Sequence, residues 1–242
     1  MTERKAILVM GAGDATGGAI AKRFAREGYV ACVARRNVDQ LTSLVDDISA
    51  AGGTARAFGC DARVEEQVLE LFATIEREVG PLEVVVFNIG ANVRFSITET
   101  TERVYRKVWE MAALAGFLAG REAARVMLPR QRGTIIFTGA TASLRGGKHF
   151  AAFASAKFAL RATAQSMARE LGPQGIHVAH PIIDGAIDTA WIAENFPAMY
   201  AKKDQDGILN PDHIADAYWM LHQQPRDAWT HELDMRPWME TF

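Results

Sequence analysis

The sequence predicts an α/β fold: a Rossmann-like, doubly wound parallel sheet of about seven strands with helices on both faces. Three observations support this prediction. Short apolar runs alternate with helical stretches, a glycine-rich turn follows the first apolar run, and the 242 residues are 49% hydrophobic, which suits one large domain. Strands covered on both faces read as continuous apolar runs, and right-handed crossovers between them give a doubly wound sheet. We therefore expect residues 1–242 to form a single domain.

The expected strands and helices follow one another as βαβ units. The strands, each a short apolar run, are expected at Ala6–Met10, Tyr29–Ala34, Ala55–Gly59, Leu82–Phe87, Thr134–Thr138, Val178–Ile183 and Glu232–Met235. The helices are expected from the glycine-rich turn to Arg26 and at Val38–Ala51, Val64–Val79, Thr101–Leu128, Phe150–Leu171 and Pro211–His222. The last of these begins with proline, which suits the first turn of a helix.

Composition and charge exclude several classes of function. The net charge is −2 and no basic patch is present, so we expect no nucleic-acid partner. No apolar stretch is long enough to span a bilayer and the charged start, Met1–Lys5, is unlike a secretory leader, so we expect no membrane association. Cys32 and Cys60 suit core positions in a reducing compartment, which predicts a cytoplasmic location. His177 and His180, three residues apart on one strand, point to opposite faces, and we predict no metal site.

A glycine-rich turn joins the first strand to the first helix. Glycine lets the backbone turn sharply and approach a diphosphate, while the N-terminal amides of the helix receive its negative charge. An ordinary turn between a strand and a helix is the alternative, but the strand–turn–helix context favours nucleotide binding. The residues expected to bind are Gly11, Gly13, Asp14, Ala15, Thr16 and Gly17.

Two arginines, Arg35 and Arg36, follow the second strand about twenty residues after the glycines. A free ribose 2′-hydroxyl calls for Asp or Glu at this place, whereas arginine accommodates a 2′-phosphate. Guanidinium groups bind phosphate oxygens in a bidentate way. The pair therefore predicts NADP(H) in preference to NAD(H), although NAD(H) stays possible because Asp14 adds a negative charge nearby. The alternative is a pair of solvated arginines that begin a helix.

These and later motifs resemble the short-chain dehydrogenase/reductase family over nearly the whole chain. The segment Met10–Gly17 is similar to the family's Thr-Gly-x-x-x-Gly-x-Gly motif, with Ala15 in place of the middle glycine and Gly13 added. The resemblance implies a substrate lid at about 189–210. It also implies contacts to the adenine from Asp61 and Ala62, to the adenosine ribose from Asn88, Ile89 and Gly90, to the nicotinamide carboxamide from Gly185, Ile187 and Thr189, and to the nicotinamide ribose from Lys157.

The family's active tetrad is Asn, Ser, Tyr and Lys, and this chain resembles it only at the lysine. The resemblance places Ala112 at the asparagine, Ala140 at the serine, Phe153 at the tyrosine and Lys157 at the lysine. Apart from the resemblance, Lys157 lies in an apolar, alanine-rich helix, where a buried lysine needs a partner. The cofactor contacts are therefore expected to be kept while the usual proton donor is missing.

Other side chains near these positions leave alternatives open. Thr141 and Ser143 lie close to Ala140 in sequence, so the assignment of Ala140 to the tetrad's serine position is open. His149 stands four residues before Phe153, and if it lies on the same helix face it is a candidate substitute donor, because histidine titrates near neutrality. The alternative is that His149 lies in a solvated loop where the helix starts.

The resulting hypothesis is an NADP(H)-dependent oxidoreductase acting on an apolar carbonyl or other activated small-molecule acceptor, with an atypical proton donor. The alternative is a catalytically deficient cofactor-binding scaffold or regulatory partner. Arg145 would steer an anionic group, or is a solvated loop arginine. The large side chains of the lid, three aromatic and one methionine, either line an apolar pocket or pack on the domain; these residues are Trp191, Phe196, Met199 and Tyr200. The resemblance also implies a homodimer or homotetramer, with close helix contact permitted by Ala112, Ala113, Ala115, Gly116, Ala159, Ala162 and Ala164.

Overall fold

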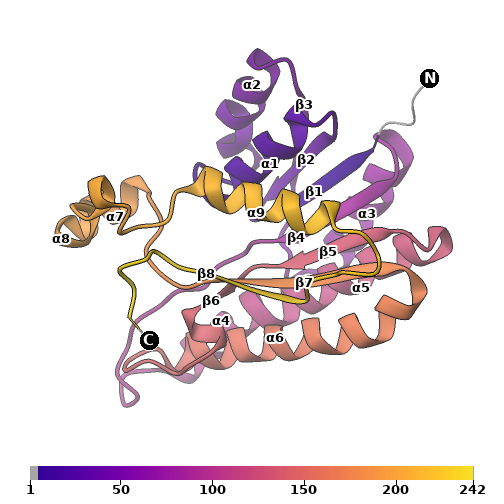
Figure 1. The fold of residues 1–242 in the computed structure, drawn as a ribbon. Helices are drawn as coiled ribbons and strands as arrows, with labels where there is room; N and C mark the ends of the chain where they lie inside the picture. The colour runs from indigo at the N-terminus through magenta and orange to yellow at the C-terminus, as the bar shows by residue number, and fades with distance from the viewer. Residues whose placement is uncertain (1–4, 242) are drawn as a thin grey trace.

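A single parallel sheet forms the centre of the molecule in the computed structural model, which describes residues 5–241 (Figure 1). Its strands are β1 (Ala6–Met10), β2 (Val30–Arg35), β3 (Thr54–Gly59), β4 (Leu82–Phe87), β5 (Gly133–Phe137), β6 (Gly139–Ala140), β7 (Ile176–Ile183) and β8 (Glu232–Met235). The spatial order is β3-β2-β1-β4-β5-β7, and both β6 and β8 pair with β7. Residues 1–4, on which the prediction about a leader rests, lie outside the described residues.

The two-residue strand β6 continues β5. Gly133 pairs with Ile176, and Gly139 pairs with Ile182, so the register against β7 is the same on both sides of Thr138. The described sheet therefore has seven strand positions, and the predicted doubly wound architecture is confirmed.

Helices cover both faces of the sheet because successive residues of each strand face opposite sides. In β1, Ile7 and Val9 belong to one core cluster, whereas Leu8 and Met10 belong to the other. The first cluster is covered by α1 (Thr16–Arg26), α2 (Thr42–Ala50) and α9 (Pro211–Gln223). The second is covered by α3 (Glu65–Glu78), α5 (Ala115–Met127) and α6 (Ala151–Leu171). None of the helices within residues 5–241 has the length and apolar character needed to cross a bilayer.

Two predicted helices are divided. The stretch Thr101–Leu128 contains α4 (Glu102–Trp109), a π-helical turn at Glu110–Leu114, and α5. The turn carries the buried Ala112 and Ala113, and π-helical turns inside α-helices often lie at functional sites. The other predicted helix, Val38–Ala51, begins with a 3₁₀ turn at Val38–Leu41. The Asn37 side chain caps this turn by accepting a hydrogen bond from the Asp39 amide at 3.2 Å.

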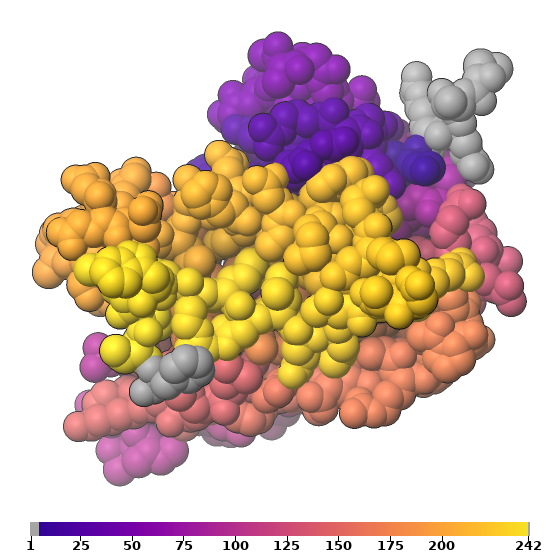
Figure 2. Space-filling model, in the orientation of Figure 1, coloured from indigo at the N-terminus to yellow at the C-terminus, as the bar shows by residue number. Residues whose placement is uncertain are grey.

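The segment proposed as a lid contains α7 (Ala190–Asn195) and α8 (Pro197–Tyr200), and it projects from the body of the domain (Figure 1). The chain that follows β8 lies against this segment (Figure 2), and Trp238 Nε1 donates to the Gln205 carbonyl at 2.9 Å. Trp191 is 57% exposed and packs against Phe196 with ring centroids 5.3 Å apart and the ring planes tilted by 59°. These aromatics therefore lie on the projecting segment rather than packing on the body of the domain.

Candidate cofactor and catalytic site

Two adjoining cavities lie at the carboxyl ends of the strands, where open α/β sheets bind ligands. One, of about 600 Å³, is lined by Phe153 and Lys157 and is called the Lys157 cavity. The other, of about 660 Å³, is lined by Arg35 and Arg36 and is called the Arg35 cavity. The residues common to both linings are Gly11, Gly13, Asp14, Asn88 and Gly90. The glycine-rich turn therefore stands between the two cavities and contributes to both.

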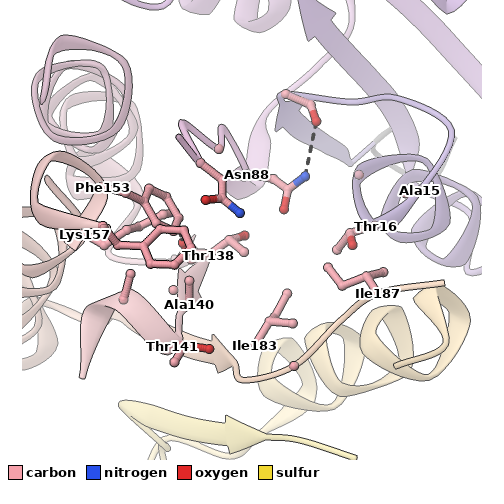
Figure 3. Close-up of a pocket in the computed structure, with 18 of the residues that line it drawn as sticks. Ala15, Thr16, Asn88, Thr138, Ala140, Thr141, Phe153, Lys157, Ile183 and Ile187 are labelled. Carbon is pink, nitrogen blue, oxygen red and sulfur yellow. Dashed lines mark hydrogen bonds between the residues drawn. The ribbon is translucent and has the colours of Figure 1, made fainter. Parts of the chain in front are cut away.

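The glycine-rich turn leaves room for close approach of a ligand. Gly11 has a φ of +86°, and a Cβ on Gly17 would lie 2.7 Å from the Gly11 carbonyl oxygen, so neither position suits a larger residue. Asn88 Nδ2 donates to the same carbonyl at 3.2 Å and fixes the turn to the end of β4 (Figure 3). Ala15 and Thr16 line the Lys157 cavity beside this turn.

The Thr16 hydroxyl is the strongest sign of a ligand-binding site in this crevice. Thr16 is 5% exposed, it lines the Lys157 cavity, and Oγ1 has no hydrogen-bond partner among residues 5–241. An unsatisfied buried polar group costs about 1–3 kcal/mol. Because Thr16 is the first residue of α1, its hydroxyl and the adjacent helix amides fit the diphosphate of a dinucleotide.

Arg35 and Arg36 lie at the carboxyl end of β2 and line the Arg35 cavity. Within the described chain, neither guanidinium makes a hydrogen bond or ion pair. Arg35 Nη1 lies 3.9 Å from the position of a Cβ built on Gly13, so it stands beside the glycine-rich turn. The two cations are therefore placed to bind a phosphate group next to that turn.

Asp61, Ala62 and Ile89 also line the Arg35 cavity, but the Asp61 carboxylate is already paired. It accepts hydrogen bonds from Arg63 Nε at 2.9 Å and Nη2 at 2.6 Å. These hydrogen bonds hold the pKa of Asp61 below its usual value. An adenine contact from this residue would therefore have to share the carboxylate with Arg63.

The segment after β7 contributes Gly185 and Ile187 to the Lys157 cavity. Thr189 lies elsewhere: its hydroxyl accepts the Ile192 amide at 3.1 Å and caps α7. Its side chain is therefore engaged in starting the projecting segment, outside the linings described for the two cavities.

The Phe153 end of the crevice is apolar at the three positions where the chain departs from the family's tetrad. Phe153 is 8% exposed and lines the Lys157 cavity together with Ala140 (Figure 3). Ala112 is fully buried in an apolar cluster that includes Phe153, behind the cavity wall. These three side chains offer no donor or acceptor to a substrate oxygen.

Lys157 lies in the same wall, on α6, and is 3% exposed. Its Nζ donates to the Thr138 carbonyl at 2.8 Å and lies 6.0 Å from the centroid of the Phe153 ring. Burial lowers the pKa of the ammonium to about 8. Lys157 therefore combines a place in the cavity wall with a proton that can be exchanged near neutral pH.

Neither Thr141 nor Ser143, the hydroxyl residues nearest to Ala140 in sequence, has a hydroxyl free to replace that of the tetrad's serine. Thr141 lines the Lys157 cavity, but its hydroxyl donates to Asp184 Oδ1 at 2.5 Å. Ser143 is fully buried, and its Oγ accepts the Ala140 amide at 3.1 Å. Both hydroxyls are engaged with the protein itself.

His149 precedes α6 rather than lying on it. The helix begins at Ala151 with Phe150 as its N-cap, and His149 has a φ of +73°. Its carbonyl accepts the Phe95 amide at 3.0 Å, and it is absent from the residues that line the Lys157 cavity. The idea that His149 shares a helix face with Phe153 is therefore wrong, because the helix starts two residues later.

A buried carboxylate that the sequence analysis did not single out lies beside this cavity. Asp184 directly follows β7 and its side chain is 1% exposed. It accepts the Thr141 hydroxyl and faces Arg145 Nη1 at 3.3 Å and Arg236 Nη2 at 3.6 Å. Arg145, which also lines the cavity, is thus paired rather than simply solvated. A charged residue at the carboxyl end of a buried strand was the available signal for Asp184.

The family model of short chain dehydrogenases matches residues 5–199 of this sequence. The chain belongs to the short-chain dehydrogenase family. A short-chain dehydrogenase from Rhodopseudomonas palustris, known from a crystal structure, is 52% identical, and the match covers 97% of this chain and 99% of that one with a TM-score of 0.84.

More distant relatives include gluconate 5-dehydrogenase of Gluconobacter oxydans, 28% identical over 92% of this chain and 80% of its own length. The alcohol dehydrogenase of the archaeon Thermococcus sibiricus, crystallised with 5-hydroxy-NADP, is 24% identical and covers 99% of both chains with a TM-score of 0.86, which is a likeness of fold.

The described part of the chain holds no cluster of side chains suited to a metal ion. Within residues 5–241, no three His, Cys, Asp or Glu side chains are grouped to hold an ion. His177 and His180 are engaged separately: His177 stacks on Trp229 with ring centroids 4.9 Å apart, and His180 faces Glu232 at 3.4 Å.

Proposed function

We propose that this chain is an NADP(H)-dependent oxidoreductase acting on an apolar carbonyl or other activated acceptor, with a proton donor other than tyrosine. The observation that carries the proposal is the buried Thr16 hydroxyl at the start of α1, beside the glycine-rich turn, which has no hydrogen-bond partner among residues 5–241. Arg35 and Arg36 supply the second argument, because both line the Arg35 cavity without hydrogen bonds to the described chain. A dinucleotide with a 2′-phosphate would satisfy all three groups.

In this proposal each end of the crevice has its own task. Thr16 and the first amides of α1 would hold the diphosphate, Arg35 and Arg36 the 2′-phosphate, and Lys157 the nicotinamide ribose. The bound cofactor would supply or accept the hydride. The rings of Phe150 and Phe153 line the cavity and would exclude water from it.

The proton would come from Lys157 or from water. General acids work best when their pKa lies near the operating pH, and burial brings the pKa of Lys157 to about 8. Its Nζ is fixed by the Thr138 carbonyl, so the direction of at least one N–H bond is set by the protein. His149 is less suited, since it lies before the helix and outside the cavity lining.

A second candidate function is a cofactor-binding scaffold or regulatory partner without turnover. The apolar side chains of Ala112, Ala140 and Phe153 favour it, because a positioned general acid typically contributes about 10²–10⁴ in rate. Both candidates predict that NADPH raises the melting temperature by binding the folded state.

Turnover separates the two candidates. We would measure the oxidation of NADPH with a panel of carbonyl compounds and quinones. Steady oxidation above the rate without protein supports the oxidoreductase, and a stabilising response to NADPH without turnover supports the scaffold. A melting temperature that does not respond to NADPH or NADH would contradict both.

Self-association and location complete the proposal. Most of the small residues expected to permit helix contact between subunits are used inside one subunit; a Cβ on Gly116, for example, would meet the side chains of Leu160 and Phe87. The outer surface of α4, α5 and α6 instead exposes Trp109, Phe117 and Phe158. We propose that a second copy covers these rings in a dimer or tetramer. Both cysteines are buried and free, which agrees with a cytoplasmic location.

A further inference from the structure

The substrate end of the Lys157 cavity combines apolar walls with one guanidinium group. Phe150, Phe153 and Ala142 line it together with Arg145. The Arg145 side chain is 39% exposed, so part of the guanidinium reaches solvent. Ligand pockets of this kind use a few polar groups to orient an apolar ligand.

Arg145 is held in place by a carboxylate that does not itself line the cavity. Asp184 faces Arg145 Nη1 at 3.3 Å and Nη2 at 3.4 Å, and its side chain is 1% exposed. Its oxygens also receive the Thr141 hydroxyl at 2.5 Å and face Arg236 at 3.6 Å. The contacts to Arg145 are long, so Asp184 orients the guanidinium without using all of its hydrogen-bonding capacity.

The charges that reach the cavity are unequal at its two ends. Arg145 and Lys157 are the cations in its lining, and the carboxylate in that lining, Asp14, lies on the glycine-rich turn. Asp184 pairs with Arg145 and Asp234 pairs with Arg236, but neither carboxylate belongs to the lining. A ligand at the Phe153 end therefore meets positive charge and apolar rings.

We propose that Arg145 is a specificity-determining residue that binds a carboxylate on the substrate, so that the preferred substrate is an apolar carbonyl compound carrying an acid group. This inference rests on the proposed function for the identity of the site. A planar guanidinium suits a carboxylate because it can donate two parallel hydrogen bonds. The Phe150 and Phe153 rings would pack against the apolar body of the same molecule.

The test uses 3-phenylpropanoate and its methyl ester, which share the apolar body and differ in charge. Each is titrated by calorimetry into the full-length protein, with and without saturating NADP⁺. We expect the acid to bind about tenfold more tightly than the ester, since hydrogen bonds to charged groups are the stronger ones. Arg145→Gln should remove this preference, and Arg145→Lys should keep part of it.

Lys148→Gln is the matched control, because Lys148 is an exposed cation three residues away that is absent from the cavity lining. It should leave the preference for the acid unchanged. Equal binding of acid and ester by the parent, binding of neither, or a preference that survives Arg145→Gln or disappears in Lys148→Gln would overturn the proposal. If Arg145→Gln fails to fold, the parent and Arg145→Lys still decide it.

The melting temperature with NADPH is measured on the same samples. A stabilising response to NADPH without any preference for the acid would overturn the role of Arg145 and leave the proposed cofactor intact. A preference for the acid without a response to NADPH or NADH would support the role of Arg145 and overturn the proposed cofactor.

Discussion

The two ends of the crevice differ in what their side chains can do before a ligand arrives. The Arg35 cavity presents two guanidinium groups without ion pairs in the described chain, next to a turn in which Gly11 and Gly17 leave no room for larger residues. At the other end, Ala140 and Phe153 present only carbon to the Lys157 cavity. The guanidinium groups of the first end suit a charged ligand, whereas Ala140 and Phe153 offer a substrate oxygen no hydroxyl.

Positioning a ligand and donating a proton contribute different amounts to the lowering of a reaction barrier. Holding reactants in the right geometry is worth about 7–11 kcal/mol. A general acid contributes about 10²–10⁴ in rate, or roughly 3–5 kcal/mol. Under the proposed function, the chain keeps the larger of these two contributions and lacks the usual acid, so restoring the acid should have a measurable effect.

The largest expected effect is a gain of activity on restoring the missing hydroxyls. The double variant Ala140→Ser, Phe153→Tyr places a phenol beside Lys157, whose Nζ lies 6.0 Å from the centroid of the present ring. We expect the rate of NADPH-dependent carbonyl reduction to rise by about 10²-fold or more. The measurement is steady-state NADPH oxidation on the carbonyl panel.

Phe150→Tyr is the matched control for this gain. Phe150 lines the same cavity, but it is the N-cap of α6 and stands seven positions from Lys157 in the sequence. An equal gain in Phe150→Tyr would show that any hydroxyl in the cavity suffices. No gain in the double variant, with NADPH binding unchanged, would show that the chain lacks more than its hydroxyls.

The same contrast shows which parts of the molecule can be predicted from the sequence. The core strands were predictable because parallel strands are buried on both faces, so Ala6–Met10 and Leu82–Phe87 stand out as continuous apolar runs. The turn Gly11–Gly17 was predictable because its task depends on local backbone shape. The two-residue strand β6 was missed, since Gly139 and Ala140 carry no periodic pattern.

Contacts between distant segments were beyond the sequence. The pairing of Asp184 with Arg145 depends on how the end of β7 meets the loop before α6, and no spacing along the chain reports it. The prediction that His149 shares a helix face with Phe153 was wrong for a local reason. The positive φ of His149 keeps this residue out of the helix that starts after Phe150. The sequence thus indicated which residues gather at the crevice better than it indicated their partners.

A smaller effect is expected from the arginines of the Arg35 cavity. In the double variant Arg35→Gln, Arg36→Gln, the dissociation constant for NADPH should rise by about 10–100-fold, because hydrogen bonds to charged groups are worth about 1.5–3 kcal/mol. The affinity for NADH, which lacks the 2′-phosphate, should change little. Fluorescence titration of both cofactors measures the two constants.

Arg103→Gln serves as the control for the loss of positive charge, since Arg103 is exposed on α4 and absent from both cavity linings. It should leave the affinity for NADPH within error of the parent. If NADH loses affinity as strongly as NADPH in the double variant, the arginines hold something other than the 2′-phosphate.

The smallest expected effect has opposite signs in the free and bound protein. Thr16→Val replaces the buried hydroxyl, which has no partner among residues 5–241, with a methyl group of similar size. Without cofactor, the melting temperature should stay the same or rise, because an unsatisfied polar group has been removed. With cofactor, the dissociation constant should rise by about 2–10-fold, the worth of one ordinary hydrogen bond.

Thr16→Ser keeps the hydroxyl and should preserve the affinity. A valine variant that is less stable without cofactor, and that binds the cofactor as tightly as the parent, would mean that the hydroxyl serves the fold and is no argument for a ligand in this crevice.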